Sequence, residues 1–219
     1  MNKHENQKFS SFPAFTSRND YESYIINQSS NTDLLHYIIA RAQNTNYFSI
    51  DTEADLYTQR PALIQFEFIH QKLSTVILLD VCHLPTVETS LKFWLICAII
   101  KYIFQKNKIL YCWGPPLLEL RKFLHVNLFT DDDLNKPEMF NLQDDFKRWH
   151  CRKFHQNVKG GNLWGLQAAI HDRFGQFLDK TERLNIWSRD LTKNTSKSIS
   201  MIQYAVNDCL AVTKIVSIM

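Results

Sequence analysis

The stretch that most constrains the fold is a short hydrophobic run that ends in two acids: residues 47–53 read YFSIDTE. Aromatic and β-branched residues of this kind are typical of a β-strand. Side chains at alternate positions of a strand lie on one face, so Asp51 and Glu53 are expected to project together. Two such carboxylates repel each other unless a cation lies between them, and hard divalent cations such as Mg²⁺ or Mn²⁺ prefer oxygen ligands. The plainer alternative is a strand end with two solvated acids.

The segments around this strand predict an α/β fold. Runs 62–69 and 74–80 also have strand character and follow through short connections, so the three strands are expected to form an antiparallel meander. Before them, Asn31 precedes apolar residues at helical spacing, to about residue 43. After them come helix 89–105, strand 108–113, helix 117–125, strand 139–142, a helix from about 144, helix 162–174 and a helix from 196 to the end. This order predicts a mixed sheet, with three antiparallel strands plus parallel strands, flanked by helices.

Length and composition favour one globular domain. The chain has 219 residues, 45% of them hydrophobic, which is enough for a sizeable core. Residues 1–18 are polar without periodicity and are expected to form a flexible N-terminal tail, whereas residues 19–219 are expected to form a single domain. The net charge of +3 is compatible with a polyanionic partner but does not require one.

The cysteines and the apolar segments indicate the compartment. The five cysteines are widely spaced and form no C-x-x-C pair, which favours free thiols in a reducing environment over a disulfide framework. The first residues are polar and show no apolar signal segment. The most apolar run, residues 93–100, is too short to span a bilayer. We therefore expect an intracellular protein, cytoplasmic or nuclear, with no membrane association.

A tyrosine and an acid near the C-terminus are candidate partners of the strand acids. Tyr204 and Asp208 are four residues apart in the predicted last helix and therefore lie on one helical face. Taken alone, this spacing is common and usually places a core tyrosine beside a surface aspartate. It becomes informative because the chain also carries the paired acids Asp51 and Glu53.

Three segments, taken together and in order, resemble the RNase D type of 3′→5′ exonuclease domain, within the DnaQ-like or DEDD superfamily of nucleases. They are 48–53 continued by PALIQF at 61–66; NLWGLQ at 162–167 continued through 174–175 and 178–180 to WSRDL at 187–191; and YAVND at 204–208. The last resembles the tyrosine variant of the family's third motif. The resemblance covers roughly residues 20–219 and implies a ribonuclease H-like sheet.

What the resemblance implies is a phosphodiester hydrolase that uses two divalent cations, Mg²⁺ or Mn²⁺. By position, Asp51 would bridge both cations, and Glu53 and Asp208 would complete the ligands of the cation that activates water. Tyr204 would orient that water. Its hydroxyl both donates and accepts hydrogen bonds, while its high pKa argues against a role as free general base.

The chain departs from the family pattern at the second motif, where the family has an Asp at the start of the helix after the fourth strand. The matching position here is Pro116, or Pro115 after a shift of one residue. Proline fits the first turn of a helix, but its side chain cannot ligate a cation. Glu119, one helical turn further on, either reaches inward as a replacement or lies solvated on the helix face. The ligand set for a second cation is therefore incomplete.

Three residues are candidates for substrate binding. Trp113 could stack a base of a single strand, and Lys180 and Arg189 lie in the family-like stretch and could line a substrate groove. Packing of helices and strands is the default interpretation of Trp113, and solvation explains Lys180 and Arg189 equally well. Two functions stay open. One is a 3′→5′ exonuclease for single-stranded nucleic acid in RNA processing, with RNA expected rather than DNA. The other is a catalytically degenerate domain that binds RNA or a protein partner without cutting.

Overall fold

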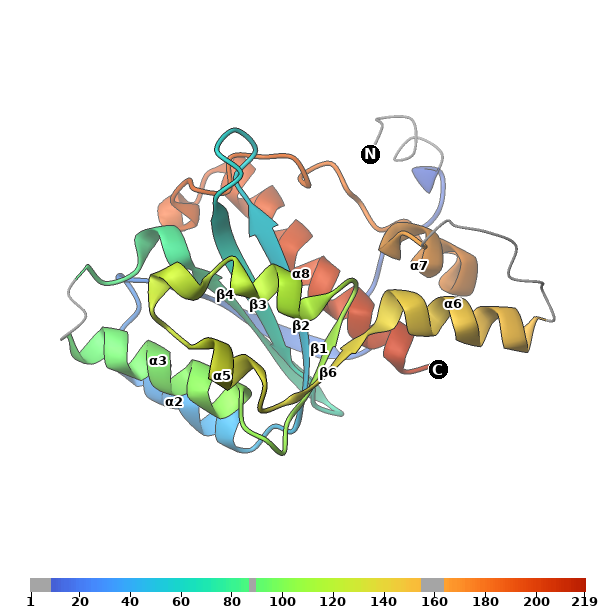
Figure 1. The fold of residues 1–219 in the computed structure, drawn as a ribbon. Helices are drawn as coiled ribbons and strands as arrows, with labels where there is room; N and C mark the ends of the chain where they lie inside the picture. The colour runs from blue at the N-terminus through green and yellow to red at the C-terminus, as the bar shows by residue number, and fades with distance from the viewer. Residues whose placement is uncertain (1–8, 87–89, 155–163) are drawn as a thin grey trace.

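The computed structural model describes residues 9–86, 90–154 and 164–219, and these residues build a six-stranded sheet (Figure 1). The strands are β1 (Asp20–Ile26), β2 (Tyr47–Ala54), β3 (Pro61–Phe68), β4 (Leu73–Asp80), β5 (Ile109–Cys112) and β6 (Glu138–Asn141). Their order in the sheet is β1-β4-β3-β2-β5-β6. β2, β3 and β4 pair antiparallel, whereas β1 with β4, β2 with β5 and β5 with β6 pair in parallel. The predicted mixed sheet, with its antiparallel meander, is confirmed.

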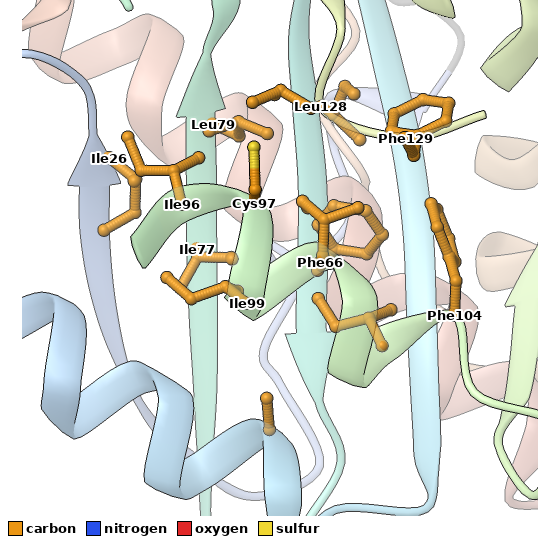
Figure 2. Packing of buried hydrophobic residues seen from close by; sticks show 14 of the residues in the cluster. Ile26, Phe66, Ile77, Leu79, Ile96, Cys97, Ile99, Phe104, Leu128 and Phe129 are labelled. Carbon is orange, nitrogen blue, oxygen red and sulfur yellow. The ribbon is translucent and has the colours of Figure 1, made fainter. Parts of the chain in front are cut away.

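Helices cover both faces of the sheet. They are α2 (Thr32–Gln43), α3 (Leu91–Ile103), α4 (Pro116–Arg121), α5 (Asp131–Leu134), α6 (Leu142–Lys153), α7 (Leu166–Phe174) and α8 (Ser196–Val216). α2 and α3 lie together over one face, and the long α8 crosses the other (Figure 1). Figure 2 shows Ile99 of α3 packed over Ile77 of β4, with Phe66 of β3 beside them in the same core.

Alternation along the central strands decides which face the acids of β2 occupy. Ile50 belongs to the core under α2 and α3. Leu63 of β3, which is paired with Glu53, belongs instead to the cluster that α8 completes. Because neighbouring residues of a strand point to opposite faces, Asp51 and Glu53 project toward α8.

Local capping residues explain the helix boundaries. Asn31 caps α2 as predicted, since its side chain accepts a hydrogen bond from Leu34 N at 2.8 Å. α4 begins at Pro116, whose missing N–H would be unpaired there, and it ends at Arg121 rather than near 125. α7 begins at Leu166 rather than at 162, and residues 162 and 163 lie outside the described residues.

The N-terminal segment differs from its prediction. Residues 1–8 lie outside the described residues. The predicted flexible tail over 1–18 is corrected for residues 14–16, because Ala14 forms a bridge with Phe177 and Phe15 N donates to Phe177 O at 2.9 Å. The Phe15 ring packs against the clusters on the α8 side, and this apolar contact holds the segment in place.

Two expectations about the whole chain can be checked against the fold. All five cysteines are free, as predicted. Among the helices of the described residues, none is long and apolar enough to cross a bilayer.

A buried lysine joins the end of α2 to β5. Lys108 is 2% exposed, and its ammonium donates to Thr45 O at 2.6 Å, to Gln43 O and Asn46 Oδ1 at 3.2 Å, and to Ala42 O at 3.5 Å. The last carbonyls of a helix have no partner within the helix, and Lys108 donates to two of them, those of Ala42 and Gln43.

Replacing Lys108 by methionine should therefore destabilise the fold. The variant keeps the apolar stem but leaves buried carbonyls unpaired, and hydrogen bonds to a charged group contribute about 1.5–3 kcal/mol to stability. We expect the free energy of unfolding, measured by urea titration, to fall by about 2–3 kcal/mol. Lys106→Met, at an exposed position two residues earlier, is the matched control. Equal stability of the two variants would contradict this role.

Candidate metal centre

Three carboxylates from two elements meet on the α8 side of the sheet. Asp51 and Glu53 end β2, Asp208 lies in α8, and one oxygen of each lies within 4.8 Å of the others. A hydrogen bond joins β2 to α8 next to these carboxylates: Ser49 Oγ of β2 donates to Cys209 O of α8 at 2.9 Å. The convergence of the strand acids with Asp208 that the family resemblance implied is therefore present, while the role of these residues as metal ligands stays a prediction.

Burial makes this cluster electrostatically costly in the absence of a cation. Asp208 is 1% exposed and Glu53 is 8% exposed. Burial, and next the charge of Asp208, raise the pKa of Asp51 from its ordinary value of 3.8 to about 7. Burial, and next the charge of Asp51, raise the pKa of Glu53 well above its ordinary value. Asp208 Oδ1 is buried and has no hydrogen-bond partner. Three hard oxygens with excess negative charge and an unsatisfied acceptor fit a divalent cation such as Mg²⁺ or Mn²⁺.

Lys180 and Tyr204 lie against the third acid. Lys180 Nζ pairs with Asp208 Oδ2 at 2.5 Å, and it lies over the Tyr204 ring, 5.1 Å from the centroid. Tyr204 is one helical turn before Asp208 and is 6% exposed. Burial, and next the charge of Asp208, raise the pKa of Tyr204, so its hydroxyl stays protonated at neutral pH. Tyr204 can therefore donate a hydrogen bond but cannot act as a base.

A cavity of about 280 Å³ opens onto the three carboxylates. Its lining residues are Asp51, Thr52, Glu53, Trp113, Gln143, Gly165, Leu166, Gln167, Lys180, Arg183, Tyr204 and Asp208. The structure thus brings together Trp113 and Lys180, two of the three candidates for substrate binding, with all four candidates for catalysis. Their roles toward a substrate stay predictions.

Arg189, the third candidate for substrate binding, is not brought to this cavity. It lines a separate hollow with Asp190, Lys193, Thr195 and Ser198. The preceding residue, Ser188, donates from its N–H and its hydroxyl to Asp55 Oδ2, just after the end of β2. The structure thus does not bring Arg189 together with the other candidates, and its role toward a substrate stays a prediction.

Arg183 is the cation that the sequence analysis missed. It lines the cavity, and its charge lowers the pKa of Glu53 and of Asp208 against the effect of burial. It lies three residues after Lys180 in the same family-like stretch, so a search for cations spaced around Lys180 would have found it. Gln143 is a second missed lining residue, and its amide donates to Trp164 O at 2.7 Å.

Trp113 is held by the same carbonyl. Trp113 Nε1 donates to Trp164 O at 3.0 Å, and its ring packs against Phe146 with centroids 5.7 Å apart. These two contacts fix the indole at the cavity wall. Trp164 itself lies just before the N-terminus of α7. Its pyrrole N–H is used internally, so what it can offer a ligand is its ring face.

The residues of the second motif lie at the start of α4 and do not line the cavity. Pro115 is the N-cap, and Pro116 is buried as the first helical residue. Glu119 accepts a hydrogen bond from Thr52 Oγ1 at 3.5 Å and pairs with Lys122 Nζ at 2.6 Å. Its side chain is 37% exposed, and it lies outside the group of three converging acids. Glu119 is therefore near β2, but its carboxylate forms an ion pair with the surface residue Lys122.

Solved structures match this chain in fold, although no protein-family model and no curated protein matches its sequence. The EXO domain of Nibbler from Aedes aegypti superposes with a TM-score of 0.66 at 16% identity, over 93% of this chain and 90% of that chain. RNase D from Escherichia coli, described as an exoribonuclease involved in structured RNA processing, has a TM-score of 0.58 at 17% identity. RNase D from Trypanosoma brucei has a TM-score of 0.57 at 12% identity.

The extent of these matches differs between the neighbours. The match covers 90% of this chain but 44% of the Escherichia coli protein, and 91% of this chain but 64% of the Trypanosoma brucei protein. This chain therefore spans less than two thirds of either RNase D. At these identities the likeness establishes the fold: the expected ribonuclease H-like fold of RNase D-type exonuclease domains is confirmed.

Proposed function

We propose that this chain is a metal-dependent 3′→5′ exonuclease domain that hydrolyses phosphodiester bonds of single-stranded nucleic acid, RNA rather than DNA. The observation that carries the proposal is the convergence of three carboxylates, two of them buried and one half-buried, at a cavity that also holds two cationic side chains. The exonuclease folds of the structural neighbours support it, and one neighbour is described as an exoribonuclease.

Each side chain of the site has a part in this proposal. Asp51, Glu53 and Asp208 would hold Mg²⁺ or Mn²⁺ through their converging oxygens. When bound, such a cation lowers the pKa of a water molecule. It also places positive charge next to the oxyanion that develops on the phosphate. Tyr204, protonated and next to Asp208, would orient the attacking water by a hydrogen bond.

The remaining lining residues would position the end of the strand. Lys180 and Arg183 face the same cavity and would pair with phosphate oxygens, with the fork of Arg183 suited to bidentate contacts. The ring of Trp113 would stack a base without regard to its identity, as aromatic platforms in single-strand channels do.

A second function is favoured by one specific observation, a proline at the first residue of α4, where the family pattern has an acid. Pro116 is buried there, and Glu119 is held by Lys122 on the helix surface. With a weakened ligand set, the chain would bind RNA or a protein partner without cutting. In that case Lys180, Arg183 and Trp113 would bind RNA as they would in the exonuclease.

Degradation of single-stranded RNA labelled at its 5′ end, with MnCl₂, separates the two functions. We expect products that shorten stepwise from the 3′ end, and loss of cutting with EDTA or in Asp51→Ala. Asp132→Ala, at an exposed acid of α5, is the matched control and should retain activity. The same sequence as DNA tests the preference for RNA. Binding of RNA with no cutting in any Mn²⁺ condition would favour the second function.

A further inference from the structure

The positive charges around the acidic cluster suggest how many cations it takes. We propose that the cluster binds one divalent cation rather than two, and that the ammonium of Lys180 supplies the positive charge that a second cation would bring. This inference rests on the metal site of the proposed function. Lys180 would thus face the substrate phosphate from the place where a second cation would otherwise lie.

The oxygens available at the cluster favour this number. Lys180 Nζ forms an ion pair with Asp208 Oδ2 at 2.5 Å. The other oxygen, Asp208 Oδ1, is buried without a hydrogen-bond partner and is therefore available to a cation. Asp51, Glu53 and Asp208 each bring one oxygen within 4.8 Å of the others, which makes a ligand set for a single ion. A second ion would have to displace Lys180 from Asp208 or rely on the second oxygens of Asp51 and Glu53, with no further carboxylate of its own.

No further acid is at hand among the described residues that line the cavity. Glu119 is the nearest candidate outside that lining, since it accepts a hydrogen bond from Thr52, the residue between Asp51 and Glu53. Its carboxylate is already paired with Lys122 Nζ at 2.6 Å. Pro116, at the start of the same helix, offers no side-chain oxygen.

The charge balance points the same way. The cavity wall carries three carboxylates, and against them stand Lys180 and Arg183. The contacts that hold Lys180 in the wall include an ion pair with Asp208 and the Tyr204 ring, and its side chain is 11% exposed. One divalent cation leaves a small positive excess that suits a phosphate, whereas two would concentrate three excess positive charges in a largely buried place, at a high electrostatic cost.

This arrangement makes an unusual prediction about the sign of a mutational effect. Removing the Lys180 charge should strengthen binding of the divalent cation, because a positive neighbour that repels it is gone. A unit charge several ångströms away in a partly buried site supports a change of about tenfold in Kd. The same change should weaken RNA binding, because a phosphate contact is lost.

Isothermal titration of the chain with MnCl₂ tests the proposal without any activity measurement. We expect one Mn²⁺ bound by the wild type, a Kd about tenfold lower in Lys180→Met, and a Kd near the wild-type value in Lys180→Arg. Lys136→Met, which removes an exposed lysine paired with Asp133 on α5, is the matched control and should leave the Kd unchanged. Circular dichroism checks that each variant is folded.

Three results would overturn the proposal. Binding of two Mn²⁺ by the wild type would refute the stoichiometry and leave the proposed function standing. Weaker Mn²⁺ binding in folded Lys180→Met would show that the lysine supports the site and does not compete with the cation. Absence of any Mn²⁺ binding by the wild type would remove the metal site itself, and with it the metal-dependent nuclease function.

Discussion

Replacing Pro116 by aspartate is expected to raise nuclease activity by on the order of 10²–10³, the usual effect of one well-placed group that stabilises transition-state charge. Pro116 is buried as the first residue of α4, a helix whose next turn already reaches Thr52 of β2 through Glu119. A carboxylate at this position would add negative charge next to β2, the strand that carries Asp51 and Glu53. RNA affinity should change little, because it depends mainly on cationic contacts to phosphates.

Rates on labelled single-stranded RNA with MnCl₂, together with RNA-binding curves, measure this effect. Pro115→Asp controls for the register of the substitution, since Pro115 is the N-cap of the same helix. If Glu119 has taken over the role, the wild type should already cut and Glu119→Gln should abolish cutting. Equal inactivity of the wild type and both aspartate variants, with RNA binding intact, would favour the binding function instead.

Replacing Asp51 by asparagine is expected to stabilise the metal-free fold at neutral pH. The pKa of Asp51 is raised from its ordinary 3.8 to about 7 in the fold, so charging this carboxyl destabilises the folded state. The contribution of Asp51 to stability is full below about pH 4 and is lost as the pH rises through about 7. Asparagine cannot charge, so the variant should not show this loss.

Melting temperatures with and without MnCl₂ measure this effect. At pH 7.5–8 the variant should melt several degrees above the metal-free wild type, since about 1 kcal/mol shifts the melting temperature by about 2–4 °C in a chain of this size. Mn²⁺ should raise the melting temperature of the wild type by mass action, by about 2.7 kcal/mol in stability at one hundred times Kd, and should hardly affect the variant. Asp132→Asn is the control. A wild-type melting curve that millimolar Mn²⁺ leaves unchanged would contradict a formed site.

The parts of the site that local periodicity encodes could be predicted from the sequence. Alternation along a strand places Asp51 and Glu53 on one face, and a four-residue spacing places Tyr204 and Asp208 on one face of a helix. That the two faces meet follows from tertiary packing, and here the family resemblance, not the local pattern, supplied the expectation. The central strands and most helices were predicted for the same reason: their apolar residues recur with period 2 or at helical spacing.

The parts set by contacts distant in sequence could not be predicted. β1 pairs with β4 across some fifty residues, from Asp20↔Leu73 to Ile26↔Leu79, and nothing local specifies that pairing. Ser188, next to Arg189, donates to Asp55, a contact between residues 133 positions apart that no local pattern specifies. The pairing of Ala14 with Phe177 likewise joins two segments that are far apart in the sequence and share no pattern.

Anomalous diffraction from crystals grown with MnCl₂ tests most directly whether the three carboxylates form a metal centre. The structure predicts one Mn²⁺ peak bounded by Asp51, Glu53 and Asp208 Oδ1, with Lys180 still paired to Asp208 Oδ2. Crystals of Asp51→Asn should show no peak at this place. Wild-type crystals with Mn²⁺ bound elsewhere, and no peak between these three side chains, would contradict the account.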